Sequence, residues 1–437
     1  MKPIFLFLLG LSVFCAASPF TWDAALFDQS DRMDAGLSTL SSAETFTVFS
    51  PTDNSDHYAN GVVLVAFKGK FYCQWQSSKT DEDSEDTWVA YSESEDGKTW
   101  SAPRALAESG VHGHRTSGGW WVNGDTLVAY VNDWPDSLSG GGFAYYRASV
   151  DGKNWTPLAP VLMRDGSPLP GIVEQDFHAL PSGRILGAAH FQPGLLVAPI
   201  YTEDPSGVRG FVKASISMET VSGGAQTRGL EPSWFVNADG NPVMIFRDQQ
   251  TTYQKLASFS VDGGETWESV EETGFPDSRA KQSAGNLADG AAYMVSNPVD
   301  SNYRVPLAVV LSEDGKHFDK AYALRTGADL QALRFPGKAK RIGYHYPKSM
   351  VAGEYLYVAY ATNKEDVEYT RVPLKDLLYH PEVLDSAGRE PSKDSVLFLR
   401  DERRRMEIHP RREIVKDAMG RSVPSKKGWI KKYGWEK

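Results

Sequence analysis

One short pattern recurs four times in this chain and restricts its fold more than any other feature. Each copy has a serine, an aspartate two residues later, a glycine directly after it and an aromatic residue at its end. The copies begin at Ser94, Ser149, Ser260 and Ser312. An aspartate can accept hydrogen bonds from turn amides, glycine can adopt a positive φ, and the aromatic ring can pack on neighbouring strands. Each copy is therefore predicted to be a turn between two β-strands.

The spacing of these turns indicates a repeat. The four serines stand 55, 111 and 52 residues apart, so we expect one lost copy near residues 204–207. Six apolar hairpins with a similar period turn on Gly69, Gly124, Gly183, Gly240, Gly290 and Gly353. A repeat of this length with four short strands is typical of one propeller blade. The sequence predicts an all-β fold, a six-bladed β-propeller over residues 45–375.

The four turn motifs resemble the Asp-boxes of the sialidase (neuraminidase) superfamily of six-bladed propellers. The resemblance covers some 330 of the 437 residues. An Asp-box is a structural turn away from the active site, and non-enzymatic propellers carry it too. It therefore indicates the fold, and the function has to be argued from other residues.

The two ends of the chain differ from the repeats. Residues 1–17 combine Lys2, an apolar run and small residues before a cut after Ala17, which is typical of a secretory signal peptide. We therefore expect a secreted or periplasmic protein. No later apolar run reaches about 18 residues, so no membrane span is predicted. Residues 18–44 form an N-terminal segment, and residues 376–437 a basic C-terminal extension that could hold a polyanionic glycan or lie solvated.

Composition excludes other classes. With 46 Lys+Arg against 56 Asp+Glu, the net charge is −10, which disfavours a nucleic-acid binder. After signal cleavage Cys73 has no cysteine partner in the chain, so no disulfide scaffold is possible. We expect a monomer without a cofactor or metal, whose partner is an acidic oligo- or polysaccharide.

Candidate site residues follow from propeller geometry. The inner strand of a blade starts near the axis, and its antiparallel neighbour ends beside it. Residues just before and just after each glycine-turned hairpin should therefore meet at one rim. Glu231 and Arg247 flank the hairpin of blade four, Arg304 opens a strand of blade five, and Tyr346, with Tyr344 as reserve, begins blade six.

The resemblance assigns roles to these residues. Sialidases have a tyrosine nucleophile at the start of blade six, and a blade-four glutamate polarises it. This implies that Tyr346 attacks and that Glu231 takes its proton. Arginines of blades four and five grip the substrate carboxylate in sialidases, which implies a clamp formed by Arg247 and Arg304.

Blade one departs from the family pattern. Sialidases begin it with Arg-Ile-Pro, whose arginine is the central member of the clamp, but residues 57–62 contain no arginine. Arg115, which opens blade two, is the candidate replacement. The acidic loop after the blade-one hairpin offers Asp81 or Asp83 as the aspartic general acid that sialidases carry there. The alternative is a solvated or cation-binding loop.

Two histidines add a separate signal. His178 precedes the blade-three hairpin turn and His190 follows it, so the rim argument predicts that they face each other. Paired histidines suit proton abstraction or a metal, although no third ligand is fixed by spacing. The alternative is a pair of buried, hydrogen-bonded histidines.

Three functions fit these residues. The first is a retaining exo-glycosidase of sialidase type that releases a terminal acidic sugar. The second is β-elimination on uronic-acid glycans, similar in plan to propeller-fold ulvan lyases, with His178, His190 and Tyr346 moving protons and Arg247 or Arg115 neutralising the uronate. The third is a non-catalytic carbohydrate-binding propeller, with sugar rings stacked on Trp75, Trp120, Trp121 and Trp134.

Overall fold

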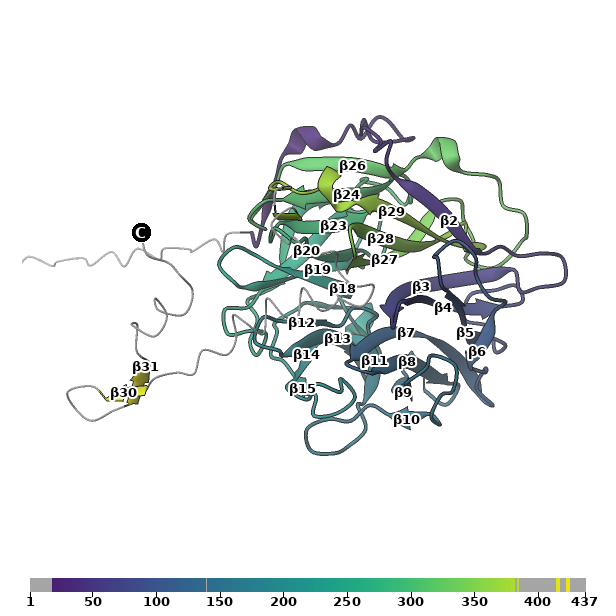
Figure 1. Ribbon diagram of the computed structural model, residues 1–437, viewed down its shortest axis with the longest axis horizontal. Helices are drawn as coiled ribbons and strands as arrows, with labels where there is room; N and C mark the ends of the chain where they lie inside the picture. Colours follow the sequence, from purple (N-terminus) through teal and green to yellow (C-terminus); the bar gives the residue numbers. More distant parts are fainter. Residues whose placement is uncertain (1–17, 139, 382, 385–413, 417–421, 425–437) are drawn as a thin grey trace, which may run out of the picture.

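Six antiparallel sheets surround a central axis in the computed structural model, which describes residues 18–138, 140–381, 383–384, 414–416 and 422–424 (Figure 1). The predicted signal peptide and most of the predicted C-terminal extension lie outside these ranges. Two short strands of the extension, β30 (Ile414–Lys416) and β31 (Ser422–Pro424), pair antiparallel. Among the described residues, no helix is long and apolar enough to cross a membrane.

The first three blades follow one another along the chain. Blade one contains β3 (Tyr58–Phe67), β4 (Lys70–Ser78), β5 (Trp88–Ser94) and β6 (Arg104–Ala107). Blade two contains β7 (Gly113–Asn123), β8 (Thr126–Pro135), β9 (Phe143–Ser149) and β10 (Ala159–Pro160). The inner strand of blade three is split into β11 (Gly171–Val173) and β12 (His178–Ala179), followed by β13 (Ile185–Phe191), β14 (Leu196–Thr202) and β15 (Val212–Lys213).

The next two blades follow a small hairpin of β16 (Thr220–Val221) and β17 (Gln226–Thr227). Blade four contains β18 (Gly229–Val236), β19 (Pro242–Asp248), β20 (Gln254–Phe259) and β21 (Glu271–Pro276). Blade five contains β22 (Ser283–Asn286), β23 (Ala292–Ser296), β24 (Leu307–Ser312) and β26 (Lys320–Arg325). In the described residues, four short 3-10 turns lie between strands: η1 (Ala24–Leu26), η2 (Ser222–Gly224), η3 (Gly327–Asp329) and η4 (Leu374–Asp376).

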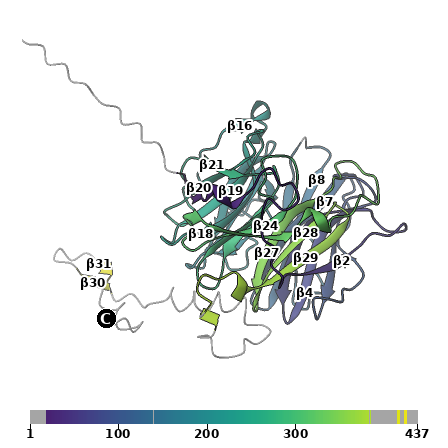
Figure 2. The same ribbon diagram turned by 90° about the horizontal axis from the view of Figure 1, so that it is seen from above.

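Blade six joins the two ends of the propeller. Its inner strands are β27 (Tyr344–Ala352), β28 (Tyr355–Thr362) and β29 (Asp366–Pro373). The outermost strand is β2 (Glu44–Phe49), which comes from the N-terminal part of the chain and pairs antiparallel with β29. The two strands lie side by side in both views (Figures 1 and 2). The ring is thus closed by backbone hydrogen bonds between distant segments, a pairing that the sequence had not indicated.

The residues before β2 are anchored to the propeller. Strand β1 (Thr21–Trp22) pairs parallel with β25 (His317–Phe318), a short strand of blade five. Phe20 is buried in the apolar core between blades four and five, where its ring contacts those of Phe235, Phe275 and Phe318. Burial of a phenylalanine side chain contributes roughly 1.5–3 kcal/mol, so this segment stabilises the two blades it covers.

The predicted turns have the expected chemistry. The six hairpin glycines have φ between 55° and 92°. In the first Asp-box, Asp96 Oδ1 accepts hydrogen bonds from the amides of Lys98 and Thr99 at 2.8 and 2.7 Å. The position expected to have lost its copy still forms a turn, because Asp204 Oδ1 accepts a hydrogen bond from the amide of Ser206 at 2.9 Å.

These turns also join neighbouring blades. The Tyr369 hydroxyl of blade six donates to the carbonyl of Gly97 in the box of blade one. The Tyr72 hydroxyl of blade one reaches the carbonyl of Asp151 in the box of blade two at 3.4 Å. These two Asp-boxes therefore contact the neighbouring blade through a tyrosine hydroxyl.

Candidate functional site

Irregularities in the inner strands mark the functional rim. The pairing of the first two strands shifts register near the axis in blades one, two, four and six. In blades one and two the positive φ at the shift belongs to Gly61 and Gly119, whereas in blades four and six it belongs to Glu231 (φ 51°) and Tyr346 (φ 54°). A left-handed conformation costs a non-glycine residue about 1–2 kcal/mol, and such strain is concentrated at functional sites. Glu231 and Tyr346 are therefore the non-glycine residues that carry a positive φ at these four register shifts.

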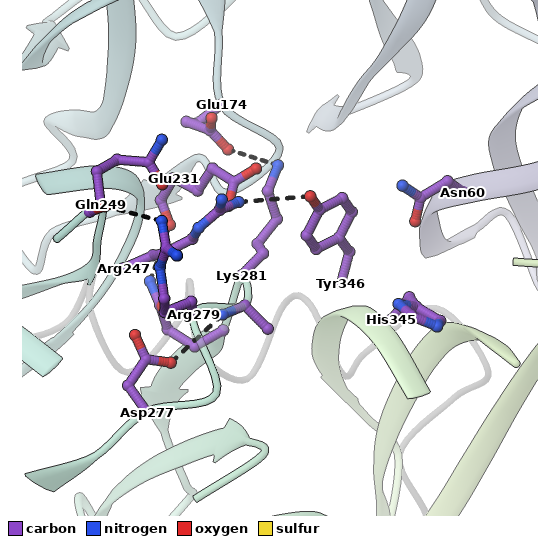
Figure 3. A network of polar contacts seen from close by, with 12 residues as sticks. Asn60, Glu174, Glu231, Arg247, Gln249, Asp277, Arg279, Lys281, His345 and Tyr346 are labelled. Carbon is purple, nitrogen blue, oxygen red and sulfur yellow. Dashed lines mark hydrogen bonds and ion pairs between the residues drawn. The ribbon is translucent and has the colours of Figure 1, made fainter. Parts of the chain in front are cut away.

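Arg247 connects these two residues. It lies near the end of β19, directly opposite Leu230 of β18. Its Nη1 donates to Glu231 Oε2 at 2.7 Å and lies 3.4 Å from the Tyr346 hydroxyl oxygen (Figure 3). Burial alone would raise the pKa of Glu231, but the charges of Arg247 and Lys281 outweigh it and lower that pKa. Glu231 is thus a carboxylate at neutral pH.

Arg304 approaches Tyr346 from blade five. Its guanidinium carbon lies 4.8 Å from the centroid of the Tyr346 ring. Its Nη1 lies 2.8 Å from Nδ1 of His345, the residue before Tyr346. The structure therefore brings together Glu231, Arg247, Arg304 and Tyr346. The reserve candidate Tyr344 is fully buried, and its hydroxyl donates to the carbonyl of Thr326 at 2.8 Å, as expected of a packing residue.

Two lysines that the sequence reasoning missed complete the cationic surroundings of Tyr346. Lys281, just before β22, has its Nζ 5.6 Å from the Tyr346 ring centroid and donates to Glu174 Oε2 at 2.9 Å. Lys364, in the turn between β28 and β29, has its Nζ 5.7 Å from the same centroid and donates to Glu82 Oε2 at 2.6 Å. Both stand at hairpin starts or ends, so the rim argument would have found them had it considered lysines as well as arginines.

The two candidate general acids in the acidic loop of blade one, Asp81 and Asp83, have different surroundings. Asp81 Oδ1 accepts a hydrogen bond from the amide of Lys338 at 2.5 Å. Asp83 keeps 62% of its side-chain surface exposed and lies 3.6 Å from Nε2 of His114. Partial desolvation and the charge of Glu82 raise the pKa of Asp83. Asp83 is thus the better proton donor of the two.

Glu82 is the unexpected member of this loop. Its Oε1 accepts hydrogen bonds from the Tyr58 hydroxyl at 2.8 Å and from Asn60 Nδ2 at 3.2 Å. Together with Lys364, these contacts occupy the start of blade one, where the family pattern would place an arginine. The loop is therefore tied to both blade one and blade six.

The predicted pairing of His178 with His190 is wrong. His178 pairs with Leu186 near the hairpin turn, whereas His190 lies opposite Ile172 at the other end of β13. The reason is the break between β11 and β12, which moves His178 away from the rim. Each histidine has its own carboxylate: His178 Nε2 lies 2.5 Å from Asp176 Oδ1, and His190 Nε2 lies 2.9 Å from Glu174 Oε1. In the described part of the chain no group of three or more His, Cys, Asp or Glu could hold a metal ion.

Residues 69–358 match the model of the BNR repeat-like domain. The chain belongs to this family. A search of curated proteins found no match.

Several solved structures share the fold of this BNR repeat-like protein. A sialidase aligns with a TM-score of 0.58 and 18% identity, over 81% of this chain and 35% of its own. The intramolecular trans-sialidase from Ruminococcus gnavus, in complex with oseltamivir carboxylate, gives 0.54 and 13% over 76% and 98%. The Trypanosoma rangeli sialidase in complex with sialic acid gives 0.53 and 14% over 89% and 66%. At such identities the likeness shows the fold, so the predicted sialidase-type propeller is confirmed.

The remaining candidates of the BNR repeat-like chain are Arg115 and the four tryptophans, and each has its own contacts away from Tyr346. Arg115 Nε donates to Asp133 Oδ1 at 2.7 Å and its Nη1 to the carbonyl of Glu108 at 3.1 Å. These contacts hold it between blade two and the segment that follows β6 of blade one. Trp75 is buried in the apolar cluster between blades six and one, and Trp120 in the cluster between blades one and two, so neither can be the stacking platform that the binding alternative expected. The indole nitrogens of Trp121 and Trp134 donate to Pro205 and Thr116, respectively.

Proposed function

We propose that this protein is a secreted sialidase-like exo-glycosidase that releases a terminal acidic sugar with retention of configuration. The proposal rests on one observation: the Tyr346 hydroxyl lies against Arg247, which in turn binds the Glu231 carboxylate. A phenol oxygen suits an anomeric carbon that carries a carboxylate, because it repels that carboxylate less than a second carboxylate would. Secretion rests on the signal peptide predicted from the sequence.

Tyr346 is the proposed nucleophile. Its oxygen attacks the anomeric carbon and forms a covalent glycosyl-enzyme intermediate, while the phenolic proton passes to Glu231. The lowered pKa of Glu231 makes it an anion that can accept this proton. The positive charge of Arg247 stabilises the negative charge that the phenol oxygen carries during attack.

Asp83 is the proposed general acid. Its raised pKa favours a protonated carboxyl, which can donate to the leaving glycosidic oxygen. In the second half of the reaction the same carboxylate removes a proton from the water that cleaves the intermediate. Arg247 and Arg304 hold the acid group of the sugar, and the positive charges of Lys281 and Lys364 beside the Tyr346 ring add to the attraction.

Isotope labelling tests this reaction. The protein is incubated in oxygen-18 water with sialylated glycans and with sulfated or uronic polysaccharides, and the products are analysed by mass spectrometry. Label in a released acidic monosaccharide is expected. An unlabelled product with unsaturated-uronate absorbance would replace the proposal with elimination, and tight binding without any product would replace it with a binding propeller.

A pair of tyrosine variants locates the chemistry. Tyr346→Phe is expected to lower turnover by at least about 10³-fold, because the nucleophilic oxygen is gone, while the acidic sugar still binds. Tyr344→Phe is the matched control, since this hydroxyl only donates to a backbone carbonyl. Equal turnover by the two variants would contradict the assignment of Tyr346.

A further inference from the structure

Three consecutive polar residues of blade three contact the other five blades. Glu174, Gln175 and Asp176, which we call the axial segment, lie between β11 and β12, and all three are buried. Glu174 Oε2 accepts a hydrogen bond from Lys281 Nζ, just before β22 of blade five, at 2.9 Å. The partners of the segment in the five blades are Gly61, Ser117, Ser233, Lys281 and Lys348. The break in the inner strand of blade three therefore gives the propeller a polar connection among all six blades.

Gln175 binds blades one and two where the pairing of their inner strands shifts register. Its Nε2 donates to the carbonyl of Gly61 at 2.9 Å, and Gly61 lies within the shift between β3 and β4. The same Nε2 lies 3.0 Å from the carbonyl and hydroxyl oxygens of Ser117. Ser117 and Gly119 flank the shift between β7 and β8, and a Cβ on Gly119 would lie 3.0 Å from the Cα of Gln175. The axial segment thus packs directly against both irregularities.

Asp176 binds blades four and six at the corresponding places. Its Oδ2 accepts a hydrogen bond from the Ser233 hydroxyl and lies 3.1 Å from Lys348 Nζ. Ser233 stands two positions after Glu231 and ends the register shift of blade four. Lys348 stands two positions after Tyr346 and ends the register shift of blade six. One carboxylate oxygen therefore connects the strand of the proposed base with the strand of the proposed nucleophile.

The charge of Asp176 strengthens this connection. Burial raises the pKa of its carboxyl, but the charges of Lys348 and His178 and the hydrogen bonds from His178 and Ser233 outweigh burial and lower that pKa to about 2. The other oxygen, Oδ1, lies 2.5 Å from His178 Nε2, so both oxygens have partners. Hydrogen bonds to an ionised acceptor are stronger than those between neutral groups. Asp176 therefore holds both strands more firmly than a neutral side chain of the same shape would.

We propose that Asp176 is a positioning residue that aligns the Tyr346 hydroxyl with Glu231 by binding each of their strands two residues further on. This inference rests on the proposed function and concerns the alignment of its nucleophile and base. Both residues have a left-handed backbone, which persists only where the surroundings hold it. A displacement of about 1 Å at a reacting group can lower the rate by about 10²-fold. Asp176 thus acts on the reaction through the two strands and without touching the substrate.

Two variants of the axial segment test the role of Asp176. Asp176→Asn keeps the shape and removes the charge, and it is expected to lower kcat by about 10–10²-fold. KM should change by less than about threefold, because alignment of the attacking oxygen matters in the transition state more than in substrate binding. Gln175→Met is the matched control, since it loses buried hydrogen bonds to blades one and two, whose register shifts carry glycines. Urea unfolding should show both variants destabilised, whereas kcat should fall strongly only in D176N.

A second substitution separates positioning from stability. In D176N the buried cation of Lys348 loses its carboxylate, and adding Lys348→Met removes that unpaired charge. The double variant D176N/K348M should regain stability, but its kcat should stay low because the strands of Glu231 and Tyr346 remain unconnected. A kcat that recovers together with stability would mean that Asp176 only supports the fold, and would overturn the inference.

Crystal structures of the variants supply a readout that needs no turnover. Arg247 Nη1 lies 2.7 Å from Glu231 Oε2 and 3.4 Å from the Tyr346 hydroxyl oxygen, and at least one of these distances should lengthen by about 1 Å in D176N and neither in Q175M. Unchanged distances in D176N, or equal losses of kcat in D176N and Q175M, would refute the positioning role. A wild type without turnover whose distances still change in D176N would sink the proposed glycosidase alone. If D176N does not fold, Ser233→Ala replaces it: the same fall in kcat is expected, and an unchanged kcat would count against the inference.

Discussion

The buried imidazole of His345 couples stability to mild acid. Its folded-state pKa lies well below 6.5, so the unfolded chain takes up a proton first as the pH falls. Stability is fully present above about pH 6.5 and is lost by about 1.4 kcal/mol for each pH unit below it, until the folded-state pKa is reached. Arg304, Arg341 and Lys364 oppose protonation in the folded state.

Urea unfolding between pH 7.5 and pH 5 measures this loss. The free energy of unfolding should fall over the range for the wild type and fall less steeply for His345→Asn, whose amide does not titrate. Parallel curves for the two proteins would show that other groups, such as His114, govern the acid sensitivity.

Asp83 allows a second prediction at the scale of a residue. Asp83→Asn removes the proton donor and is expected to lower kcat by about 10²–10⁴-fold on a natural glycoside. An aryl glycoside with a good leaving group needs less protonation, so its loss should be much smaller. Asp81→Asn is the control in the same loop, because this carboxylate binds a backbone amide. Equal losses for both substrates would contradict acid catalysis by Asp83.

Individual site residues also show which parts of the site could be predicted from the sequence. Glu231, Arg247, Arg304 and Tyr346 could be placed at one rim because antiparallel hairpins bring their two ends together. Lys281 and Lys364 follow the same rule, but the resemblance to sialidases points only to arginines as carboxylate ligands, so these lysines were not predicted. His178 could not be placed, because the break in the inner strand of blade three has no signature in the pattern of apolar residues.

At the scale of elements, the Asp-box turns make a prediction about stability. Gly152 has φ 69°, and a Cβ there would overlap the buried ring and hydroxyl of Tyr72 in the neighbouring blade. Gly152→Ala is expected to cost about 1–2 kcal/mol for the backbone, with the steric overlap adding to that. Gly166 has φ 83° and nothing within 4 Å, so Gly166→Ala pays the backbone cost alone.

Thermal unfolding distinguishes these two glycines. The melting temperature of G152A should lie below that of G166A, and both should lie below that of the wild type. Equal melting temperatures would mean that the box of blade two does not lock against Tyr72. The comparison isolates packing between blades from backbone strain within a turn.

The strands and turns also explain why the fold could be predicted from the sequence. Each Asp-box is a local turn of a few residues, so its serine, aspartate and glycine are visible in the sequence. The repeat then gives the number of blades. The pairing of β2 with β29 in blade six could not be predicted, because the two strands are separated by the rest of the propeller in the sequence. Neither strand carries a motif that indicates its partner.

For the whole molecule, the closure by β2 predicts the effect of truncation. A chain that begins at residue 50 loses β2 and exposes the edge of β29, which favours aggregation. A chain that begins at residue 42 keeps β2 but loses β1 and the buried side chains of Phe20, Phe27 and Leu37. We expect insoluble protein from the first chain and a soluble propeller with a lower melting temperature from the second. A soluble, cooperatively unfolding first chain would show that closure is dispensable.

The pairing of β2 with β29 also has a consequence for how the protein is made. β2 leaves the ribosome early, but its partner follows about 320 residues later, which at roughly 5–20 residues per second is a delay of about 15–60 s. Throughout that interval the strand has an open edge that could pair with another nascent chain. The propeller therefore cannot be completed one blade after another during synthesis. Blade six forms only when β29, which is made last, pairs with β2, which is made first.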